Sequence, residues 1–372
     1  MSKSFRVVPV VQMFDTCKEF CEAYQIGEGD LIFTNPAYFE GLMDSYASGA
    51  TVVYFKNYGK GEPTDVMIEA LYQDIRDIPF QRLIAVGGGS IIDVAKLLVQ
   101  ETVLPIEELY AKKIPTKKVK ELIIVPTTCG TGSELTSVSV IELTKQGTKL
   151  GLQTDEQFAD AAVLIPEMLN SLPAGPFGKS AIDALIHASE SFLSPKASAF
   201  TQMYSETAIR LLLRGFLQIQ KHGIEERKKY NKEFLYASAM AGIAFGNAGC
   251  AAVHAMSMSF ASSHHVAHGE ANYALFTEVF QTYQKMQPKG EIEKYNAILS
   301  QELGCEEEVV YEKLEEVLNC VLEKKPLRFY GVTEEELPVY TKTVMEKQGR
   351  LTANNYVPLT GEDVLRIYQA LL

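Results

Sequence analysis

The stretch RLIAVGGGSIIDVAKLLVQ, residues 82–100, decides the fold class. Residues 82–86 form a short apolar run typical of a buried strand, and the glycines at 87–89 follow at once. Ser90 is a suitable N-cap for a helix through IIDVAKLLVQ, with Asp93 three residues later. A strand, a glycine-rich turn and a helix N-terminus together form an anion site, because free N–H groups and the helix dipole face the ligand. A pyrophosphate suits such a site, although the pattern is also typical of a tight strand-to-helix turn.

Similar units lie on both sides of this stretch. A helical pattern opens at Pro63 and runs to about Ile75. Strands alternating with helices predict a mostly parallel, doubly wound, Rossmann-like sheet. The further strands that we expect are residues 30–34, 51–55, 121–126, 137–143, 149–153 and 161–165.

The pattern changes after three prolines, Pro166, Pro173 and Pro176. Beyond them the sequence predicts long helices and no strands. We therefore expect an α/β domain over residues 1–172 and an all-helical domain over residues 173–372. The predicted helices of the second domain are residues 177–194, 199–222, 231–249, 311–324, 333–348 and 361–371.

Composition narrows the class of protein. The chain has 372 residues, 47% of them hydrophobic, and a net charge of −12, which argues against a nucleic-acid or anionic-membrane surface. No apolar run approaches the roughly 20 residues that a membrane span needs. Six scattered cysteines indicate reduced thiols and a cytoplasmic protein, and Cys17 and Cys21 have the spacing of one helix face.

A second polar loop, PTTCGTGSE at residues 126–134, also follows a predicted strand. Thr127 and Thr128 supply hydroxyls, and the glycines supply flexibility. Two such loops at adjacent strand ends would form the crevice in which open α/β sheets bind ligands. The alternative is a polar connection to the next strand. Cys129 within the loop is expected to be a small buried residue.

A third stretch, SAIDALIHASE at residues 180–190, places a carboxylate and an imidazole on one helix face. Asp183 and His187 are four residues apart and lie about 40° from one another around a helix. Four of the six histidines fall within residues 251–273, and the last three of these stand in an expected turn before Gly269. Asp183 and His187 with His254 and His268 could close one divalent metal site. Satisfied core histidines and a polar helix face are the alternatives.

Taken together, these motifs resemble those of the iron-containing (group III) alcohol dehydrogenase family. The resemblance implies a nucleotide-binding domain followed by a helical metal-binding domain, an architecture like that of dehydroquinate synthase. It implies NAD(H), with NADP(H) as the alternative, a divalent metal, Fe(II) or Zn(II), a small alcohol or aldehyde substrate, and a homodimer. The segments that carry the resemblance are GGGSIIDVAK (87–96), PTTCGTGSE (126–134), IDALIHASE (182–190), AFGNAGCAAVHAMS (244–257) and HGEANY (268–273).

The resemblance also implies roles for single residues. The metal ligands would be Asp183, His187, His254 and His268. Met258 stands where many members carry a histidine near the nicotinamide, so proton transfer would fall to His265, a cofactor ribose hydroxyl or water. Asn35 stands where NAD-preferring members often have an aspartate. The cofactor-contact positions are Asn35, Gly87, Gly88, Gly89, Ser90, Asp93, Thr127, Thr128 and Lys149.

The branch of the family that these motifs resemble most interconverts 4-hydroxybutyrate and succinic semialdehyde, so this is the reaction that the resemblance implies. Asn247, Asn354 and Asn355 are candidate amide donors to the far carboxylate. The alternatives are a 1,3-propanediol, butanol or glycerol dehydrogenase, a dehydroquinate-synthase-like lyase, and a binding protein without turnover.

Overall fold

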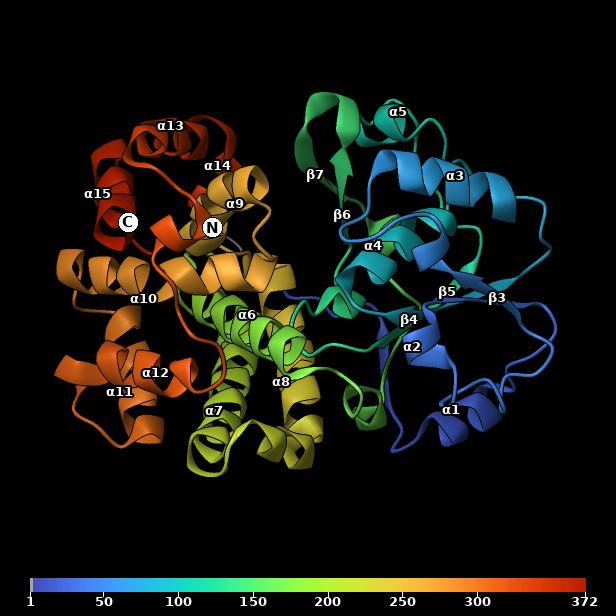
Figure 1. The fold of residues 1–372 in the computed structure, drawn as a ribbon, viewed down its shortest axis with the longest axis horizontal. Coiled ribbons are helices and arrows are strands. Elements are labelled where there is room, and N and C mark those ends of the chain that lie inside the picture. Colours follow the sequence, from blue (N-terminus) through green and yellow to red (C-terminus); the bar gives the residue numbers. More distant parts are fainter. Residues whose placement is uncertain (1–2) are drawn as a thin grey trace. The chain divides into compact units, whose positions relative to one another are not determined.

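The computed structural model describes residues 3–372, which form two compact units (Figure 1). One unit is residues 7–172. The other is residues 173–372 together with residues 3–6, which were expected in the first domain. The amide group of Asn247 exchanges hydrogen bonds with the backbone of Arg6, and the ring of Phe5 stacks on Phe200. These contacts hold the start of the chain in the helical unit.

The α/β unit contains the parallel sheet that the sequence predicts. Six strands lie in the order β1-β8-β5-β4-β2-β3, and every neighbouring pair is parallel. The strands are β1 (Val10–Met13), β2 (Asp30–Thr34), β3 (Thr51–Tyr54), β4 (Arg82–Gly87), β5 (Glu121–Pro126) and β8 (Ala161–Leu164). The helices of this unit are α1 (Cys17–Tyr24), α2 (Pro36–Phe39), α3 (Asp65–Ile75), α4 (Gly89–Leu98) and α5 (Ile106–Tyr110).

Both faces of the sheet are covered. Leu83 and Ala85 of β4 pack in a core with the buried residues of α3, α4 and α5. Ile84 and Val86, which point to the opposite face, pack in a second core with α1 and α2. A parallel strand buried on both faces needs an unbroken apolar run, which explains why RLIAV was recognisable in the sequence.

Some local expectations for this unit were wrong. Helix α4 begins at Gly89 with Gly88 as its N-cap, so Ser90 is not the cap. Helix α3 is capped by the Thr64 hydroxyl, which accepts from the Met67 N–H, so Pro63 precedes the helix instead of opening it. Strand β1 was not expected, and β6 (Val138–Leu143) and β7 (Thr148–Gln153) form a separate antiparallel hairpin.

The second unit is helical, as expected. Helices α10 and α11 were missed, and α12 ends at Asn319 instead of continuing to residue 324. Its helices are α6 (Ala174–Leu193), α7 (Ala199–His222), α8 (Asn231–Ala248), α9 (Ala252–His264), α10 (His268–Met286), α11 (Glu291–Leu303), α12 (Val310–Asn319), α13 (Leu337–Lys347), α14 (Gly349–Thr352) and α15 (Gly361–Leu371).

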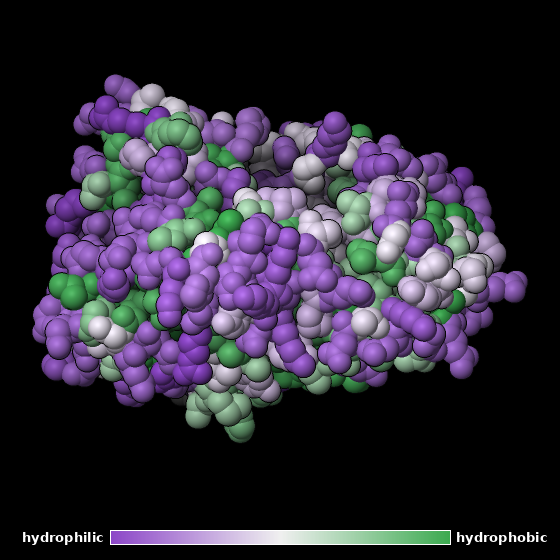
Figure 2. All heavy atoms as spheres, turned by 60° about the horizontal axis from the view of Figure 1, so that its bottom comes forward, coloured by the Kyte–Doolittle hydropathy of each residue, from purple (hydrophilic) through white to green (hydrophobic). Residues whose placement is uncertain are grey.

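Polar side chains dominate the face drawn in Figure 2, where hydrophobic ones are scattered. Among the described residues no single helix has the length and apolar character to cross a membrane, and one bent pair, Ile224–Ala248 with Ala252–His264, meets the criterion only when joined.

Lys96 on α4 is fully buried and ties that helix to the loop after β5. Its Nζ donates to Ser133 Oγ and to the Val138 carbonyl, each at 2.7 Å. Asp93 accepts from Ser133 Oγ at 2.7 Å and from the Val140 N–H at 2.9 Å. Burial lowers the pKa of Lys96 and raises the pKa of Asp93, while the attraction between the two charges opposes both shifts.

Replacing Lys96 by Met should lower the free energy of unfolding by about 3–5 kcal/mol, because the Asp93 side chain, only 14% exposed, would lose its cation. Urea denaturation measures the loss. Lys117→Met is the control, since Lys117 and Glu101 form a pair whose side chains are 62% and 56% exposed. Such a pair contributes at most about 1 kcal/mol. Equal losses in the two variants would contradict the structural role of Lys96.

Candidate metal centre and nucleotide-binding loops

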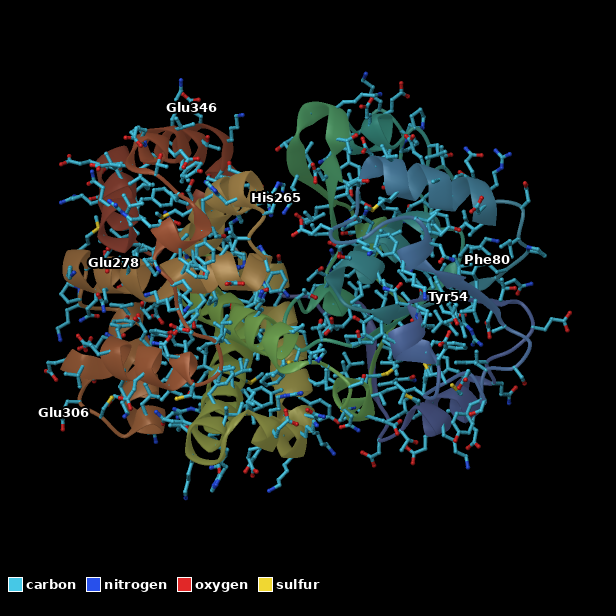
Figure 3. All side chains as sticks on the ribbon, viewed as in Figure 1. Tyr54, Phe80, His265, Glu278, Glu306 and Glu346 are labelled. Atoms are coloured by element: carbon cyan, nitrogen blue, oxygen red, sulfur yellow. The ribbon has the colours of Figure 1, made fainter. Side chains whose placement is uncertain are left out.

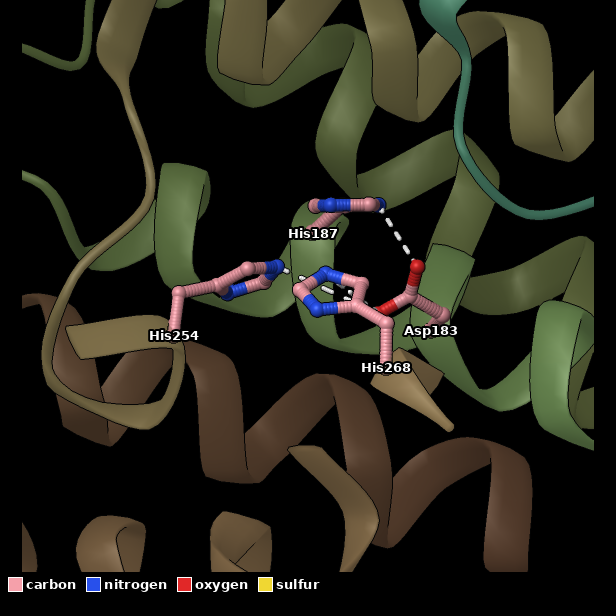
Figure 4. A group of neighbouring side chains, drawn as sticks. All are labelled: Asp183, His187, His254 and His268. Atoms are coloured by element: carbon pink, nitrogen blue, oxygen red, sulfur yellow. Dashed lines mark ion pairs between the residues drawn. The ribbon is translucent and has the colours of Figure 1, made fainter. Parts of the chain in front are cut away.

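The structure brings the four predicted metal ligands together from three helices (Figure 4). Asp183 and His187 lie one turn apart on α6, His254 lies in the first turn of α9, and His268 begins α10. One ligand atom from each residue lies within 4.8 Å of the other three. The sequence could not show this convergence, because the residues are spread over 86 positions.

The separations within this group suit ligands of one ion. Asp183 Oδ1 lies 3.9 Å from His254 Nε2 and 3.8 Å from His268 Nε2, and Oδ2 lies 3.9 Å from His187 Nδ1. These distances are too long for hydrogen bonds. Donor atoms that each sit about 2 Å from a shared cation are separated by roughly 3–4 Å.

Gly269 allows α10 to approach α6. A Cβ at this position would lie 2.1 Å from the Lys179 carbonyl oxygen and 3.2 Å from the Asp183 Cβ. Any side chain would therefore push His268 away from Asp183. The glycine was expected to mark a turn, but it lies in the first turn of α10 and serves helix packing instead.

The group is open on one side. The side chains of Asp183, His187 and His254 are 4%, 6% and 7% exposed, while that of His268 is 42% exposed. The His187 ring is held between Phe245 and His254, with ring centroids 4.4 and 4.6 Å away. A small molecule could therefore reach this group from the His268 side, as a catalytic metal site requires.

Asp183 is held as an anion. Burial alone would raise its pKa, but the three histidines and Asn272 outweigh burial and lower it below the usual range. The Asn272 amide donates to Asp183 Oδ1 at 2.7 Å and lies 3.2 Å from His268 Nε2. The Ser257 hydroxyl donates to the Asn272 carbonyl oxygen. An ionised carboxylate is the form that binds a cation.

Two residues near the ligands were missed in the sequence. Glu190 and Cys250 form a second close group with His254, with ligand atoms within 4.8 Å. Glu190 Oε2 lies at hydrogen-bond distance from His254 Nδ1, 2.6 Å, and the carboxyl group accepts from two backbone N–H groups, so hydrogen bonding accounts for the contact of Glu190 with His254. The spacing from Asp183, seven residues on one helix face, was the available signal for Glu190.

The two polar loops of the α/β unit meet at neighbouring strand ends, as predicted. Gly87 at the end of β4 is paired with Pro126 at the end of β5, and the Thr127 N–H donates to the Gly87 carbonyl at 3.1 Å. A Cβ on Gly88 would lie 3.2 Å from Thr128 Cγ2. One on Gly89 would meet the Thr131 methyl at 3.0 Å. The glycines therefore also serve loop packing.

Other predicted cofactor residues have partners of their own. Asn35 follows β2, the neighbour of β4, and its Oδ1 accepts from the Lys56 N–H at 2.8 Å. Asp93 is bonded to Ser133 and to the hairpin, and the Lys149 ammonium pairs with Glu62. Contact of these three residues with a cofactor stays a prediction.

His265 does not join the metal-ligand group. It is exposed on the loop after α9, where it is labelled in Figure 3. The Asn247 amide donates to the Arg6 and Ile243 carbonyls, and the Asn354 amide donates to the Cys250 and Arg350 carbonyls. These bonds give Asn247 and Asn354 structural roles and leave both without support as carboxylate donors. Cys129 is fully buried, as expected.

Comparison with known proteins identifies the family. The chain matches the family model described as iron-containing alcohol dehydrogenase over residues 12–166, and the model described as Fe-containing alcohol dehydrogenase family, C-terminal, over residues 178–372. A 4-hydroxybutyrate dehydrogenase of Clostridium kluyveri is 45% identical over 99% of this chain and 100% of its own. Long-chain-alcohol dehydrogenase 1 of Geobacillus thermodenitrificans is 32% identical over 91% of this chain and 88% of its own.

Solved structures confirm the predicted architecture. The sulfoacetaldehyde reductase of Bifidobacterium kashiwanohense, solved in complex with NAD+, has a TM-score of 0.87 at 21% sequence identity, covering 100% of this chain and 99% of its own. At that identity the likeness shows the fold. The two family models and the two relatives show that this chain belongs to the iron-containing alcohol dehydrogenase family.

Proposed function

We propose that the chain interconverts 4-hydroxybutyrate and succinic semialdehyde with NAD(H), at a divalent metal held by Asp183, His187, His254 and His268. The convergence of these four side chains carries the proposal of a metal centre. The substrate comes from the relative that is 45% identical over nearly the whole chain and is named for this reaction. Fe(II) is the proposed metal, with Zn(II) as the alternative, because one carboxylate and three imidazoles accept either ion.

The ligand residues fit a cation on two counts. His254 Nε2 is buried and has no hydrogen-bond partner within residues 3–372, although it points at the Asp183 carboxylate. The pKa of the Asp183 carboxyl group is lowered, so the group is an anion. With a metal and NAD(H) bound, the metal would polarise the substrate oxygen, and the nicotinamide would exchange a hydride with the adjacent carbon.

The loops of the α/β unit fit the phosphates of a dinucleotide. The N-cap of α4 is Gly88, so no side chain at that position caps the first-turn N–H groups. The Thr127 hydroxyl in the second loop is buried without a hydrogen-bond partner in the described chain. We propose that Gly87, Gly88, Gly89 and Ser90 with Thr127 and Thr128 hold the pyrophosphate, with NADP(H) as the alternative to NAD(H).

Proton transfer and assembly complete the proposal. Met258 has no titratable group, so we propose the exposed His265 for proton transfer, with a ribose hydroxyl or water as alternatives. The cysteines form no disulfide within residues 3–372, which supports a cytoplasmic location. A homodimer without nucleic-acid or membrane partners stays a prediction.

Replacing His268 by Ala should abolish metal retention and turnover while the protein stays folded. The variant loses one of four metal ligands. Because the His268 ring is partly exposed, its removal leaves no large internal cavity. Metal content after anaerobic dialysis against a chelator, together with circular dichroism, measures both effects. His222→Ala is the control, because His222 is an exposed histidine at the end of α7. Full metal content and activity in the His268 variant would refute the ligand assignment.

Succinic semialdehyde should be reduced with a kcat/KM on the order of 100-fold above that of butanal, because a site built to bind a carboxylate discriminates against an uncharged analogue. Oxidation of NADH and NADPH by the metal-loaded enzyme measures this ratio and the cofactor preference. Equal rates with butanal would keep the chemistry and favour a 1,3-propanediol, butanol or glycerol substrate. A metal-loaded protein that reduces neither aldehyde would contradict the proposed reaction.

A further inference from the structure

Glu190 lies on the same face of α6 as the two metal ligands of that helix. It follows Asp183 by seven residues, which places it within about 20° of Asp183 around the helix axis. The side chain is buried, with 1% of the residue exposed. A carboxyl group in such a position needs hydrogen-bond donors around both of its oxygens.

The donors all come from the start of α9. Glu190 Oε1 accepts from the Val253 N–H at 2.7 Å, and Oε2 accepts from the Ala251 N–H at 2.9 Å. Oε2 also lies 2.6 Å from His254 Nδ1. The two N–H groups belong to the N-cap and first turn of α9, where no intrahelical acceptor exists. Glu190 therefore fixes both the backbone that carries His254 and the ring itself.

This arrangement selects one form of the His254 ring. Backbone N–H groups can only donate, so both oxygens of Glu190 are acceptors toward them. Oε2, which already accepts from the Ala251 N–H, is placed to accept a hydrogen bond from a proton on His254 Nδ1 as well, which leaves Nε2 to face the cation site. Nε2 is the atom that lies 3.9 Å from Asp183 Oδ1.

We propose that Glu190 is a positioning residue, which holds His254 with Nδ1 protonated and Nε2 directed at the cation site. The proposal rests on the metal centre proposed above. A carboxylate on the far nitrogen also strengthens the near nitrogen as a donor, because it stabilises positive charge on the ring. Glu190 touches neither substrate nor cofactor in this proposal.

The test is Glu190→Gln, which keeps the shape of the side chain and removes its charge. In this proposal the three hydrogen-bond partners of Glu190 all donate through N–H groups. Glutamine has one acceptor oxygen, so its NH2 group would point at one of these N–H groups, donor against donor. The affinity for Co(II), measured by competition with a chelator, should fall roughly 10–100-fold. The visible spectrum at saturating Co(II) should also change, because it reports the geometry of the ligands.

Ser189→Ala is the matched control. Ser189 is the neighbour of Glu190 on α6 and is fully buried, and its hydroxyl bonds the Leu185 carbonyl and Tyr295. The variant loses buried hydrogen bonds without touching a metal ligand, so its unfolding midpoint should fall while its Co(II) affinity stays at the wild-type value. An unchanged Co(II) affinity and spectrum in Glu190→Gln would reduce Glu190 to a helix cap and overturn the proposal.

A second measurement needs no variant at Glu190. Nitrogen NMR of the Zn(II)-loaded wild-type protein, with labelled histidine, should show one ring with a proton on Nδ1 and the metal on Nε2 that is absent from His254→Asn. Coordination of His254 through Nδ1 would overturn the proposal. A wild-type protein that binds neither Co(II) nor Zn(II) would instead refute the metal centre itself, and aldehyde reduction is not needed for either result.

Discussion

The burial of one charged carboxylate, Asp183, governs the arrangement of the helical unit. An ion in a protein interior is stable only if nearby groups replace the water that it has lost. Imidazoles from α6, α9 and α10 and the Asn272 amide surround this carboxylate, so three helices must meet at one point. Gly269 removes the side chain that would keep α10 from reaching it.

In the α/β unit the main constraint is the close packing of two loops. Its two loops leave neighbouring parallel strands and touch, with Gly88 against Thr128 and Gly89 against Thr131. Lys96 and Asp93 of α4 both form hydrogen bonds with Ser133 Oγ in the second loop. Backbone N–H groups at the start of α4 are thereby held by buried contacts, independently of any ligand.

The sequence predicted those features that depend on local pattern. Unbroken apolar runs marked β4 and β5, and the four-residue spacing placed Asp183 and His187 on one face. Features that depend on distant contacts were missed or misread. Gly269 was read as a turn because glycine disfavours helices, whereas the contact with α6 requires it there. In the sequence Glu190 looks like any charged residue on a helix, because its hydrogen bonds to the start of α9 are visible only in the structure.

The edges of elements were also unpredictable, for physical reasons. Strand β1 pairs with β8 alone, and Val10 and Met13 are 59% and 58% exposed, so its pattern lacks the continuity of the central strands. The hairpin of β6 and β7 has the composition of a strand pair in any sheet. Only the backbone pairing shows that it lies outside the parallel sheet.

The helical unit is discontinuous along the chain, because residues 3–6 bond to Asn247 while residues 7–172 build the other unit. The polypeptide therefore passes between the units twice, after Arg6 and after Leu172. A gene divided at residue 172 would encode the α/β unit whole but not the helical unit, since the C-terminal fragment would lack Phe5, whose ring stacks on Phe200 and Tyr204.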